Sequence, residues 1–232
     1  MSGDGTREVC GLTRLLDVLG PIMIGPSSSH TAGAARLGYL ARVLLGEPPV
    51  HVDVVLHGSF AATFRGHGTD LALVGGLLGF RPDDERIRDA MKHAADAGLS
   101  VDVKQGDLGD VHPNTVRMTL RGATGKELTV MGSSVGGGKV EITELSGLPV
   151  SLTGERNALV AMYPDRPGIV ASVTSVLAKA DVNIATMRVA RSGRGKTAVC
   201  IIEIDQDLPD DVVRAVTALP NMEKVIAVEG VR

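Results

Sequence analysis

Aromatic side chains are scarce in this chain of 232 residues, which has no Trp, two Tyr and three Phe. An excess of basic charge is also absent, because 24 Lys and Arg stand against 27 Asp and Glu. Proteins that bind nucleic acid use a basic surface to contact phosphates and aromatic rings on which bases stack. With neither feature present, we expect no nucleic-acid partner.

Long apolar runs are lacking as well. A helix that spans a bilayer needs about 20 apolar residues, and the longest run here, residues 71–80, is interrupted by Gly75, Gly76 and Gly79. The N-terminus does not show the charged, apolar and small-residue pattern of an export signal. We therefore expect a soluble, cytoplasmic protein without a membrane partner.

Cysteine is nearly absent, with only Cys10 and Cys200, far apart in the chain. Two cysteines without a CxxC spacing exclude a disulfide framework. They also exclude a self-contained zinc or iron–sulfur site, which needs about four ligands. We expect no metal ligand in this chain.

Histidine and glycine are plentiful but unevenly placed. All six histidines lie in the first half of the chain, namely His30, His51, His57, His67, His93 and His112. Of 29 glycines, 24 lie at or before Gly147. Because histidine is the usual acid–base residue near neutral pH, any chemistry is expected in this half. The glycines and proline of residues 144–155 are typical of a linker. We therefore predict an α+β fold in two domains, residues 1–150 and 156–232.

The second domain has a readable order of elements. Its pattern predicts strands and helices in the order βαββαβ, at residues 157–163, 169–180, 182–190, 197–204, 208–219 and 225–228. This order is that of a ferredoxin-like fold. At the start of the first helix, Asp165 is a plausible cap and Pro167 suits the first helical position.

Residues 165–168 (DRPG) and 180–184 (ADVNI), with the spacing around them, resemble the ACT domain, a ferredoxin-like module that senses amino acids. In that family the ligand lies where the first strand turns into the first helix, against a neighbouring copy. The resemblance implies that Gly168 and Asn183 contact an effector and that the chain self-associates through this domain. The alternative is that these residues only form the turn and the start of a strand.

Residues 25–33 (GPSSSHTAG) are the most distinctive motif of the first domain, and a helical pattern at Leu37, Leu40 and Leu44 follows them. A Ser or Thr at a helix start caps free backbone N–H groups. The same groups attract an anion such as a carboxylate. Three serines followed by His30 exceed what capping requires, so one serine can cap while the others and His30 are free to face a ligand.

A second polar turn places His67 between two glycines, in residues 66–70 (GHGTD), before a helix predicted from Leu71. Glycine on both sides permits close approach of the backbone to a small ligand. Thr69 or Asp70 is expected to cap the helix.

Two more polar loops complete the set. Residues 112–115 (HPNT) precede a predicted strand, and residues 132–139 (GSSVGGGK) have the composition of a backbone nest for an anion. The last loop is not a P-loop, because Val140 stands where Ser or Thr is required.

In this order, ahead of an ACT domain, these motifs closely resemble the beta subunit of bacterial two-subunit iron–sulfur-dependent L-serine dehydratases, from Leu15 onward. The resemblance implies conversion of L-serine to pyruvate and ammonia, and leaves open a preference for threonine, which differs by one methyl group. It also implies a 4Fe–4S cluster that acts as Lewis acid in place of pyridoxal phosphate. The cluster cysteines would belong to a partner alpha subunit, which agrees with the two distant cysteines here.

The same resemblance assigns site residues by position. His30 and His67 are the acid–base candidates, with no decision between them. The residues expected to hold the substrate's carboxylate and amino group are Ser27, Ser28, Ser29 and Thr31. His112 and Asn114 either shape the same pocket or brace a strand turn, and His57 is equally open. His51 and His93 have no supporting pattern and are expected at the surface or in packing. Lys139 either attracts an anion or is solvated.

The first domain also resembles the substrate-sensing domain of some bacterial phosphoglycerate dehydrogenases. The alternative function is therefore a non-catalytic module that senses serine or another small acid. Histidines in glycine-flanked turns favour the enzyme, because a sensor does not need them. Since ACT domains commonly pair, a dimer of heterodimers is expected.

Overall fold

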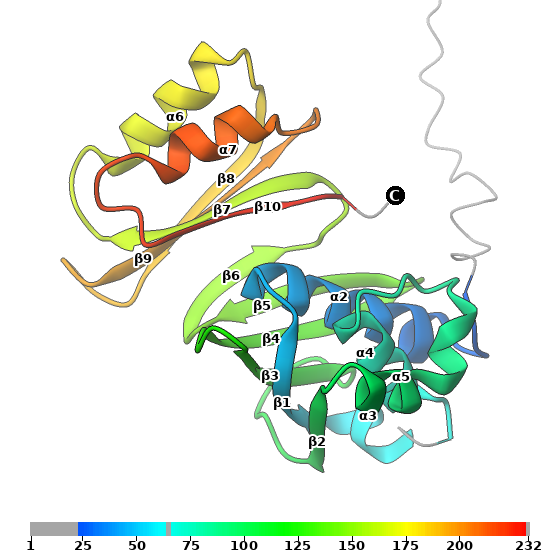
Figure 1. Cartoon of the computed structure of the whole chain (residues 1–232). Coiled ribbons are helices and arrows are strands. Elements are labelled where there is room, and N and C mark those ends of the chain that lie inside the picture. The colour runs from blue at the N-terminus through cyan, green and yellow to red at the C-terminus, as the bar shows by residue number, and fades with distance from the viewer. Residues whose placement is uncertain (1–22, 64–65, 231–232) are drawn as a thin grey trace, which may run out of the picture.

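The computed structural model describes residues 23–63 and 66–230. Cys10 lies outside the described residues, and so does Leu15, where the family resemblance starts. The fold is α+β, as predicted, with one sheet and its helices in each of two domains (Figure 1). Within residues 23–63 and 66–230, no helix has the length and apolar character needed to cross a membrane.

The N-terminal domain is a six-stranded sheet covered by helices. Its elements are η1 (Ser28–Gly33), α2 (Ala34–Leu45), β1 (Pro49–Leu56), α3 (Gly58–Thr63), α4 (Thr69–Leu77), η2 (Glu85–Asp89), α5 (Ala90–Asp96), β2 (Ser100–Gln105), β3 (Thr115–Gly122), β4 (Glu127–Gly136), β5 (Lys139–Leu145) and β6 (Leu148–Leu152). The strand order is β2-β1-β3-β4-β5-β6, in which only β1 and β2 run parallel.

Helices α2 to α5 gather on one face of this sheet (Figure 1). Alternate residues of the strands, such as Val52 and Val54 of β1, are fully buried against them. The intervening positions, such as His51 and Asp53, are partly exposed on the opposite face. This alternation is the expected pattern for a sheet with one covered and one solvated face.

Helices α2 and α4 cross with their backbones in contact. A Cβ on Gly38 of α2 would lie 2.3 Å from the carbonyl oxygen of Leu73, and one on Gly76 of α4 would lie 2.0 Å from that of Ala35. Only glycine permits so close an approach, because the obstructing atoms belong to backbone. The crossing therefore fixes the helix that follows η1, which contains His30, and the helix that follows the turn with His67.

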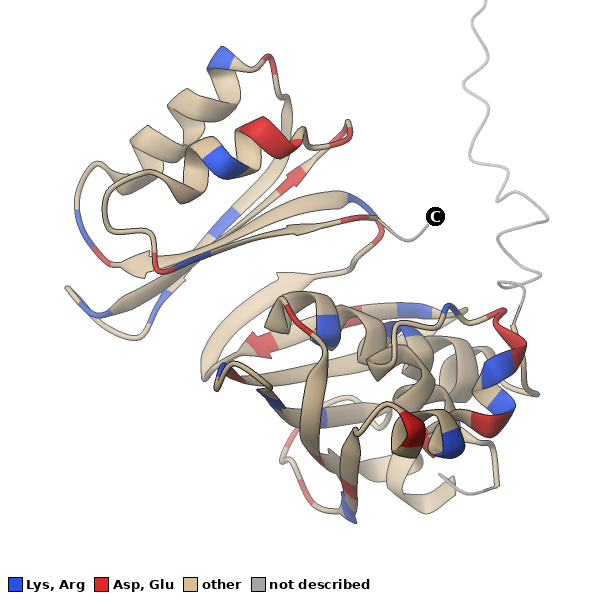
Figure 2. Cartoon of the chain, viewed as in Figure 1, with Lys and Arg blue, Asp and Glu red and all other residues tan. Residues whose placement is uncertain are grey.

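The C-terminal domain is a four-stranded antiparallel sheet with two helices. Its elements are β7 (Asn157–Pro164), α6 (Ile169–Lys179), β8 (Ile184–Arg191), β9 (Thr197–Ile204), α7 (Asp210–Thr217) and β10 (Lys224–Val228), which match the predicted βαββαβ order. The strand order is β10-β7-β9-β8. In Figure 2 the acidic start of α7 and its basic last turn are visible, a charge order that complements the helix dipole.

Both faces of this second sheet are covered, which explains the uninterrupted apolar runs of β7 and β9. Leu159 and Cys200 pack with α6 and α7 in one hydrophobic cluster. The alternate residues Val160 and Ile201 join the core of the N-terminal domain instead. The sheet thus lies between its own helices and the first domain (Figure 1).

The predicted linker 144–155 is wrong in its middle part. Leu148–Leu152 forms β6, an edge strand paired with β5, after a tight turn at Ser146 and Gly147 with φ of 50° and 80°. Pro149 is compatible with a strand here because it lies at the edge of the sheet. The glycines and proline that suggested a linker therefore form a hairpin.

Residues 132–139, which have the composition of a nest, form the end of β4 and a hairpin turn. β4 continues to Gly136, and three consecutive glycines, Gly136 to Gly138, turn the chain into β5 with positive φ values. Their conformational freedom serves a hairpin turn. Lys139 starts β5 and forms an exposed ion pair with Glu155 at 3.4 Å.

The predicted capping of α6 by Asp165 is not observed, because Asp165 makes tertiary contacts instead. α6 begins at Ile169 after Gly168, which adopts a left-handed conformation with φ of 89°. Asp165 instead accepts a hydrogen bond from the N–H of Gly195 and pairs with Arg191 at 2.7 Å. Its carboxylate therefore anchors the β8–β9 hairpin and does not cap the helix.

Candidate functional site

The polar loops singled out in the sequence converge at one end of the six-stranded sheet. β1 ends at Leu56 and its antiparallel neighbour β3 begins at Thr115, so the segments that follow β1 and precede β3 meet there. Thr115 is paired with Ser133, which brings the last part of β4 to the same end. Both η1 and the start of α4 pack against this region.

The motif at residues 25–33 forms η1, one turn of π-helix, a rare element that is frequent at functional sites. Ser27 caps it, since its Oγ accepts a hydrogen bond from the backbone N–H of His30 at 3.1 Å. η1 lies so close to β4 that a Cβ on Gly33 would be 2.1 Å from Ser134 Oγ. The prediction that one serine caps is confirmed. The half-buried Ser28 and Ser29 make no side-chain hydrogen bond to another described residue.

His30 is held on both sides, whereas the sequence suggested a free imidazole. Its Nδ1 lies 3.3 Å from Ser27 Oγ, and its Nε2 lies 3.1 Å from Ser59 Oγ. Phe60 packs against the ring edge-on, with centroids 5.3 Å apart. Burial, followed by the charge of His67, lowers the pKa of His30, and the hydrogen bond with Ser59 opposes the shift. The surroundings of His30 therefore favour its neutral imidazole form.

His67 lies in the turn before α4, with its ring centroid 5.0 Å from that of His30 and the ring planes tilted by 51°. Thr31 Oγ1 is 3.5 Å from the carbonyl oxygen of His67. The Nδ1 atom of His67 is buried and has no hydrogen-bond partner in the part of the chain that the structure describes. An unpaired buried polar group costs about 1–3 kcal/mol, so this nitrogen is suited to a partner that a ligand supplies.

Unpaired buried polar atoms are concentrated at this end of the sheet. Among the described residues six such side-chain atoms occur, and four of them belong here: His67 Nδ1, Thr69 Oγ1, Asn114 Oδ1 and Ser134 Oγ. Folded proteins leave few buried polar groups unpaired, so the concentration indicates a place for a polar ligand. Thr69 was expected to cap α4, but the cap is Gly68, with φ of 66° and no side-chain hydrogen bond.

A pocket of about 320 Å³ opens beside His67. Its lining includes Thr31 and Arg88 as well as the glycines around His67. The volume falls in the range of small-molecule sites. Arg88 belongs to η2 and was not singled out in the sequence, because only the fold brings that segment opposite Thr31. Ser59 was missed as a partner of His30 for the same reason.

The loop before β3 divides its roles. His112 is exposed, and its Nδ1 accepts a hydrogen bond from the backbone N–H of Asn114 at 3.1 Å, while its carbonyl accepts one from Thr115 Oγ1 at 2.6 Å. These contacts brace the strand turn, one of the two expected roles. The backbone carbonyl of Asn114 accepts from the N–H of Ser134 at 2.9 Å, and its side-chain Oδ1 is buried without a partner among the described residues.

The remaining histidines have contacts of their own. His57 Nδ1 accepts a hydrogen bond from the N–H of Leu108 at 3.2 Å, which braces the loop after β2. His93 of α5 packs edge-on against Phe80, with ring centroids 5.6 Å apart. His51 lies on the open face of the sheet, with its Nε2 3.3 Å from Asp53 Oδ2. None of these three contacts involves the pocket beside His67.

The two residues expected to bind an effector do not meet within one chain. Gly168 follows β7 at the end of the sheet where Pro164 pairs with Thr197. Asn183 precedes β8 at the opposite end, where its Nδ2 donates to Asp205 Oδ2 at 2.8 Å. A ligand that contacts both positions requires a second copy of the domain.

Comparison with known proteins agrees with both parts of the chain. Residues 15–107 match the family described as serine dehydratase beta chain, and residues 158–221 match the ACT domain. "Probable L-serine dehydratase, beta chain" of Bacillus subtilis (strain 168) is 46% identical over 211 residues, which cover 91% of this chain and 96% of that protein. "L-serine dehydratase, beta chain" of Peptoniphilus asaccharolyticus is 40% identical over 201 residues, 86% of this chain and 90% of that protein.

A more distant likeness extends to a different enzyme. D-3-phosphoglycerate dehydrogenase of Mycobacterium tuberculosis (strain ATCC 25618 / H37Rv) is 29% identical over 195 residues, which cover 84% of this chain but 37% of that protein. The first two relatives share the whole arrangement at a higher identity. The chain therefore belongs to the serine dehydratase beta chain family and carries an ACT domain at residues 158–221.

Proposed function

We propose that this chain is the beta subunit of an L-serine dehydratase (L-serine ammonia-lyase), which deaminates L-serine to pyruvate and ammonia together with an alpha subunit that holds a 4Fe–4S cluster. The observation that carries the proposal is the contact between His30 and His67, whose ring centroids lie 5.0 Å apart among serine and threonine hydroxyls. The names of the relatives at 46% and 40% identity support the choice of reaction.

Substrate binding is assigned to polar groups at the same end of the six-stranded sheet as His67. Arg88 lines the pocket, and its guanidinium is the charged partner for the serine carboxylate, because guanidinium and carboxylate groups form strong paired hydrogen bonds. Ser28 and Ser29 offer hydroxyl groups that form no hydrogen bond with another described residue. Asn114 Oδ1, a buried acceptor without a partner in the described part of the chain, suits the substrate ammonium group.

His67 is the better base of the two histidines, because its Nδ1 has no partner among the described residues while both ring nitrogens of His30 are engaged by serines. The imidazole takes the α-proton of serine, the electron pair forms the Cα–Cβ double bond, and hydroxide leaves Cβ. The resulting aminoacrylate tautomerises to an imine that water hydrolyses to pyruvate and ammonia. Because the lowered pKa of His30 favours its neutral form, His30 opposes the positive charge that His67 gains less than a charged imidazole would.

A bound 4Fe–4S cluster would supply a Lewis-acidic iron that makes hydroxide a workable leaving group. The residues of this chain fit a cluster whose ligands lie on the partner. Cys200 is 1% exposed in the core of the C-terminal domain, and burial raises the pKa of its thiol to about 11. A buried, protonated thiol is a poor ligand, since metals bind the thiolate. The other cysteine, Cys10, lies outside the described residues.

The test is an anaerobic assay of pyruvate formation from serine by the two subunits together, after iron and sulfide reconstitution. His67→Gln should lower kcat by about 10²-fold or more, the usual contribution of a general base. His93→Gln is the matched control, because His93 of α5 packs on Phe80 and does not line the pocket beside His67. Full activity of the His67 variant, or dehydration by this chain without its partner, would refute the assignment.

The second candidate function is a serine-sensing module without catalysis, favoured by the 29% identity to D-3-phosphoglycerate dehydrogenase. Calorimetry of serine binding to this chain separates the two. Serine binding with no pyruvate under any partner or iron condition would make the sensor the better assignment.

Self-association through the ACT domain belongs to the same proposal. β8 is an edge strand, and its exposed Met187 and Val189 are 40% and 48% accessible. Antiparallel pairing of two copies along β8 would bring the Asn183 end of one copy beside the Gly168 end of the other, which creates the shared effector site. Analytical ultracentrifugation of wild type and Val189→Lys tests the pairing, because a charge at the edge opposes strand addition.

A further inference from the structure

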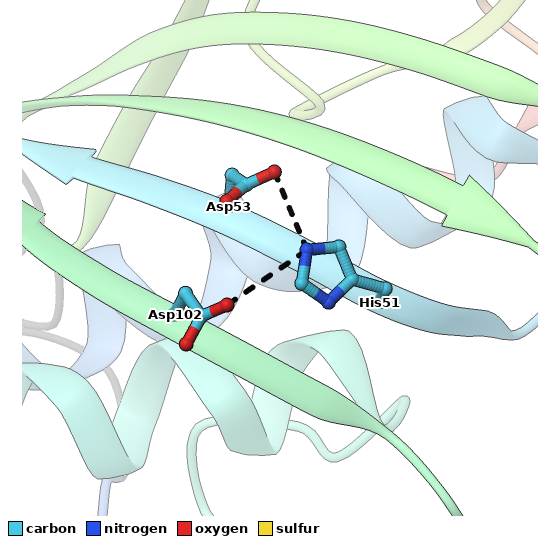
Figure 3. A group of neighbouring side chains, drawn as sticks. All are labelled: His51, Asp53 and Asp102. Atoms are coloured by element: carbon cyan, nitrogen blue, oxygen red, sulfur yellow. Dashed lines mark hydrogen bonds and ion pairs between the residues drawn. The ribbon is translucent and has the colours of Figure 1, made fainter.

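We propose that His51, Asp53 and Asp102 bind a divalent transition-metal ion of the zinc class on the open face of the six-stranded sheet. Figure 3 shows the imidazole of His51 directed toward both carboxylates. The cluster is separate from the pocket beside His67 and does not depend on the proposed dehydratase reaction. Residue spacing does not indicate this cluster, because Asp102 lies far along the chain from the other two residues.

The sheet itself sets the positions of the three side chains. His51 and Asp53 are two residues apart on β1, so they share a face, while the intervening Val52 is fully buried on the helix side. Asp102 of β2 is directly opposite Asp53 in the parallel register of the two strands. Ligands placed on adjacent strands of one sheet are held more firmly than ligands on loops.

The donor atoms already lie close to the separations that a metal ion requires. His51 Nε2 is 3.3 Å from Asp53 Oδ2 and 4.0 Å from Asp102 Oδ2. All three donor atoms lie within 4.8 Å of one another. Ligands at about 2.0–2.2 Å from a tetrahedral zinc ion are themselves separated by about 3.3–3.6 Å. The Asp102 side chain is 62% exposed, so it has room to move closer to the other two donors.

The charge pattern around the cluster also favours a cation. Like charges directly opposite one another on neighbouring strands are destabilising, and Asp53 and Asp102 are such a pair. In the described part of the chain neither carboxylate forms an ion pair with Lys or Arg, and His51 is the group between them. The arginine opposite His51, Arg121, is engaged by Glu127 at 3.0 Å. A divalent ion would offset the repulsion more fully than a shared proton.

The ligand set selects the class of metal. One imidazole nitrogen and two carboxylate oxygens suit zinc, cobalt or nickel, whereas magnesium and calcium prefer oxygen ligands only. Three protein ligands leave at least one coordination position for water. Because the side chains are 26%, 40% and 62% exposed, the site is open and binds less tightly than an enclosed four-ligand site.

The experiment is isothermal titration calorimetry of zinc chloride into the full chain, freed of metal, in a buffer that does not chelate zinc. The expected result is one zinc per chain at this site, with affinity weakened at least about tenfold by His51→Gln and by Asp102→Asn. His93→Gln and Asp96→Asn, which remove the same groups from α5, should bind zinc as the wild type does. Cobalt should give a visible absorption band with the wild type that the two site variants lack.

Circular dichroism establishes that the variants are folded, which is expected because all three side chains lie on the solvated face. Zinc should raise the melting temperature of the wild type but not that of the site variants. Equal zinc affinity in wild type and site variants, absence of zinc binding at micromolar concentration, or equal binding of magnesium would overturn the proposal.

Discussion

The crossing of α2 and α4 makes one glycine unusually intolerant of change. A methyl group on Gly76 would lie 2.0 Å from the carbonyl oxygen of Ala35 and 2.7 Å from the backbone nitrogen of Tyr39. Ordinary contact begins at 3.4 Å, and neither obstructing atom is a side chain that can rotate away. Gly76→Ala therefore forces the two helices apart by about 1 Å or more.

The neighbouring Gly75 provides a matched comparison. A methyl group there would meet Ile87 Cγ1 at 2.9 Å, which is a side-chain atom and not backbone. Both substitutions gain about 1 kcal/mol from the better helix propensity of Ala. Overpacking against rigid backbone costs about 3 kcal/mol, the upper end of the usual range. Gly76→Ala should therefore lose about 2 kcal/mol of unfolding free energy, while Gly75→Ala stays within about 1 kcal/mol of wild type.

For a chain of this length the loss corresponds to a melting temperature lower by about 4–8 °C. Differential scanning calorimetry of the two variants and the wild type measures it. Since α2 follows η1 and α4 follows His67, the same separation should weaken the His30–His67 contact and lower pyruvate formation in the assembled enzyme. If the melting temperature of Gly76→Ala equals that of Gly75→Ala and is at or above that of the wild type, the backbone contact between the helices is not what positions them.

Three further outcomes are expected. Ser27→Ala should cost about 1 kcal/mol in guanidinium unfolding, because the cap of η1 is lost; an unchanged midpoint would contradict the capping role. The pKa of His30 is lowered in the folded chain by burial and His67, so the unfolded chain binds the proton first as the pH falls. Unfolding free energy should therefore decrease below pH 6.5, the unfolded value, and His30→Gln should flatten that part of the profile. In a Cys10→Ser chain, Cys200 should react with a thiol reagent only as the protein unfolds, since it is buried with its pKa raised to about 11; rapid labelling of the native chain would show otherwise.

The C-terminal domain was predictable because its apolar runs are long and separated by clear turns. Strand 197–204 was predicted with the bounds that the structure has, and the helix from Ile169 ends one residue earlier than predicted. The caps were not predictable, because the tertiary contacts of Asp165 compete with its local one. β6 was missed since Pro149 and flanking glycines have the composition of a linker, and an edge strand tolerates them.

For the candidate site, sequence motifs indicated the loops but not the partners within them. His30 and His67 were both singled out, and the structure places their rings in contact. Ser59 engages His30, and Arg88 lines the pocket. Both contacts depend on segments that only the folded sheet and helices bring together. A histidine's role follows from its hydrogen-bond partners, which residue type and spacing do not specify.

The shared core between the two sheets bears on how the ACT domain could act. Val160 and Ile201 are buried in the same cluster as Leu148 and Leu152 of β6. A swing of the domain away from its neighbour would expose this apolar surface to water, at about 25 cal/mol for each Å². The ACT domain therefore shares its hydrophobic core with the N-terminal domain. A chimera that exchanges the ACT domain must preserve the apolar face toward β6. A signal from a bound effector would therefore reach the first domain through that apolar face.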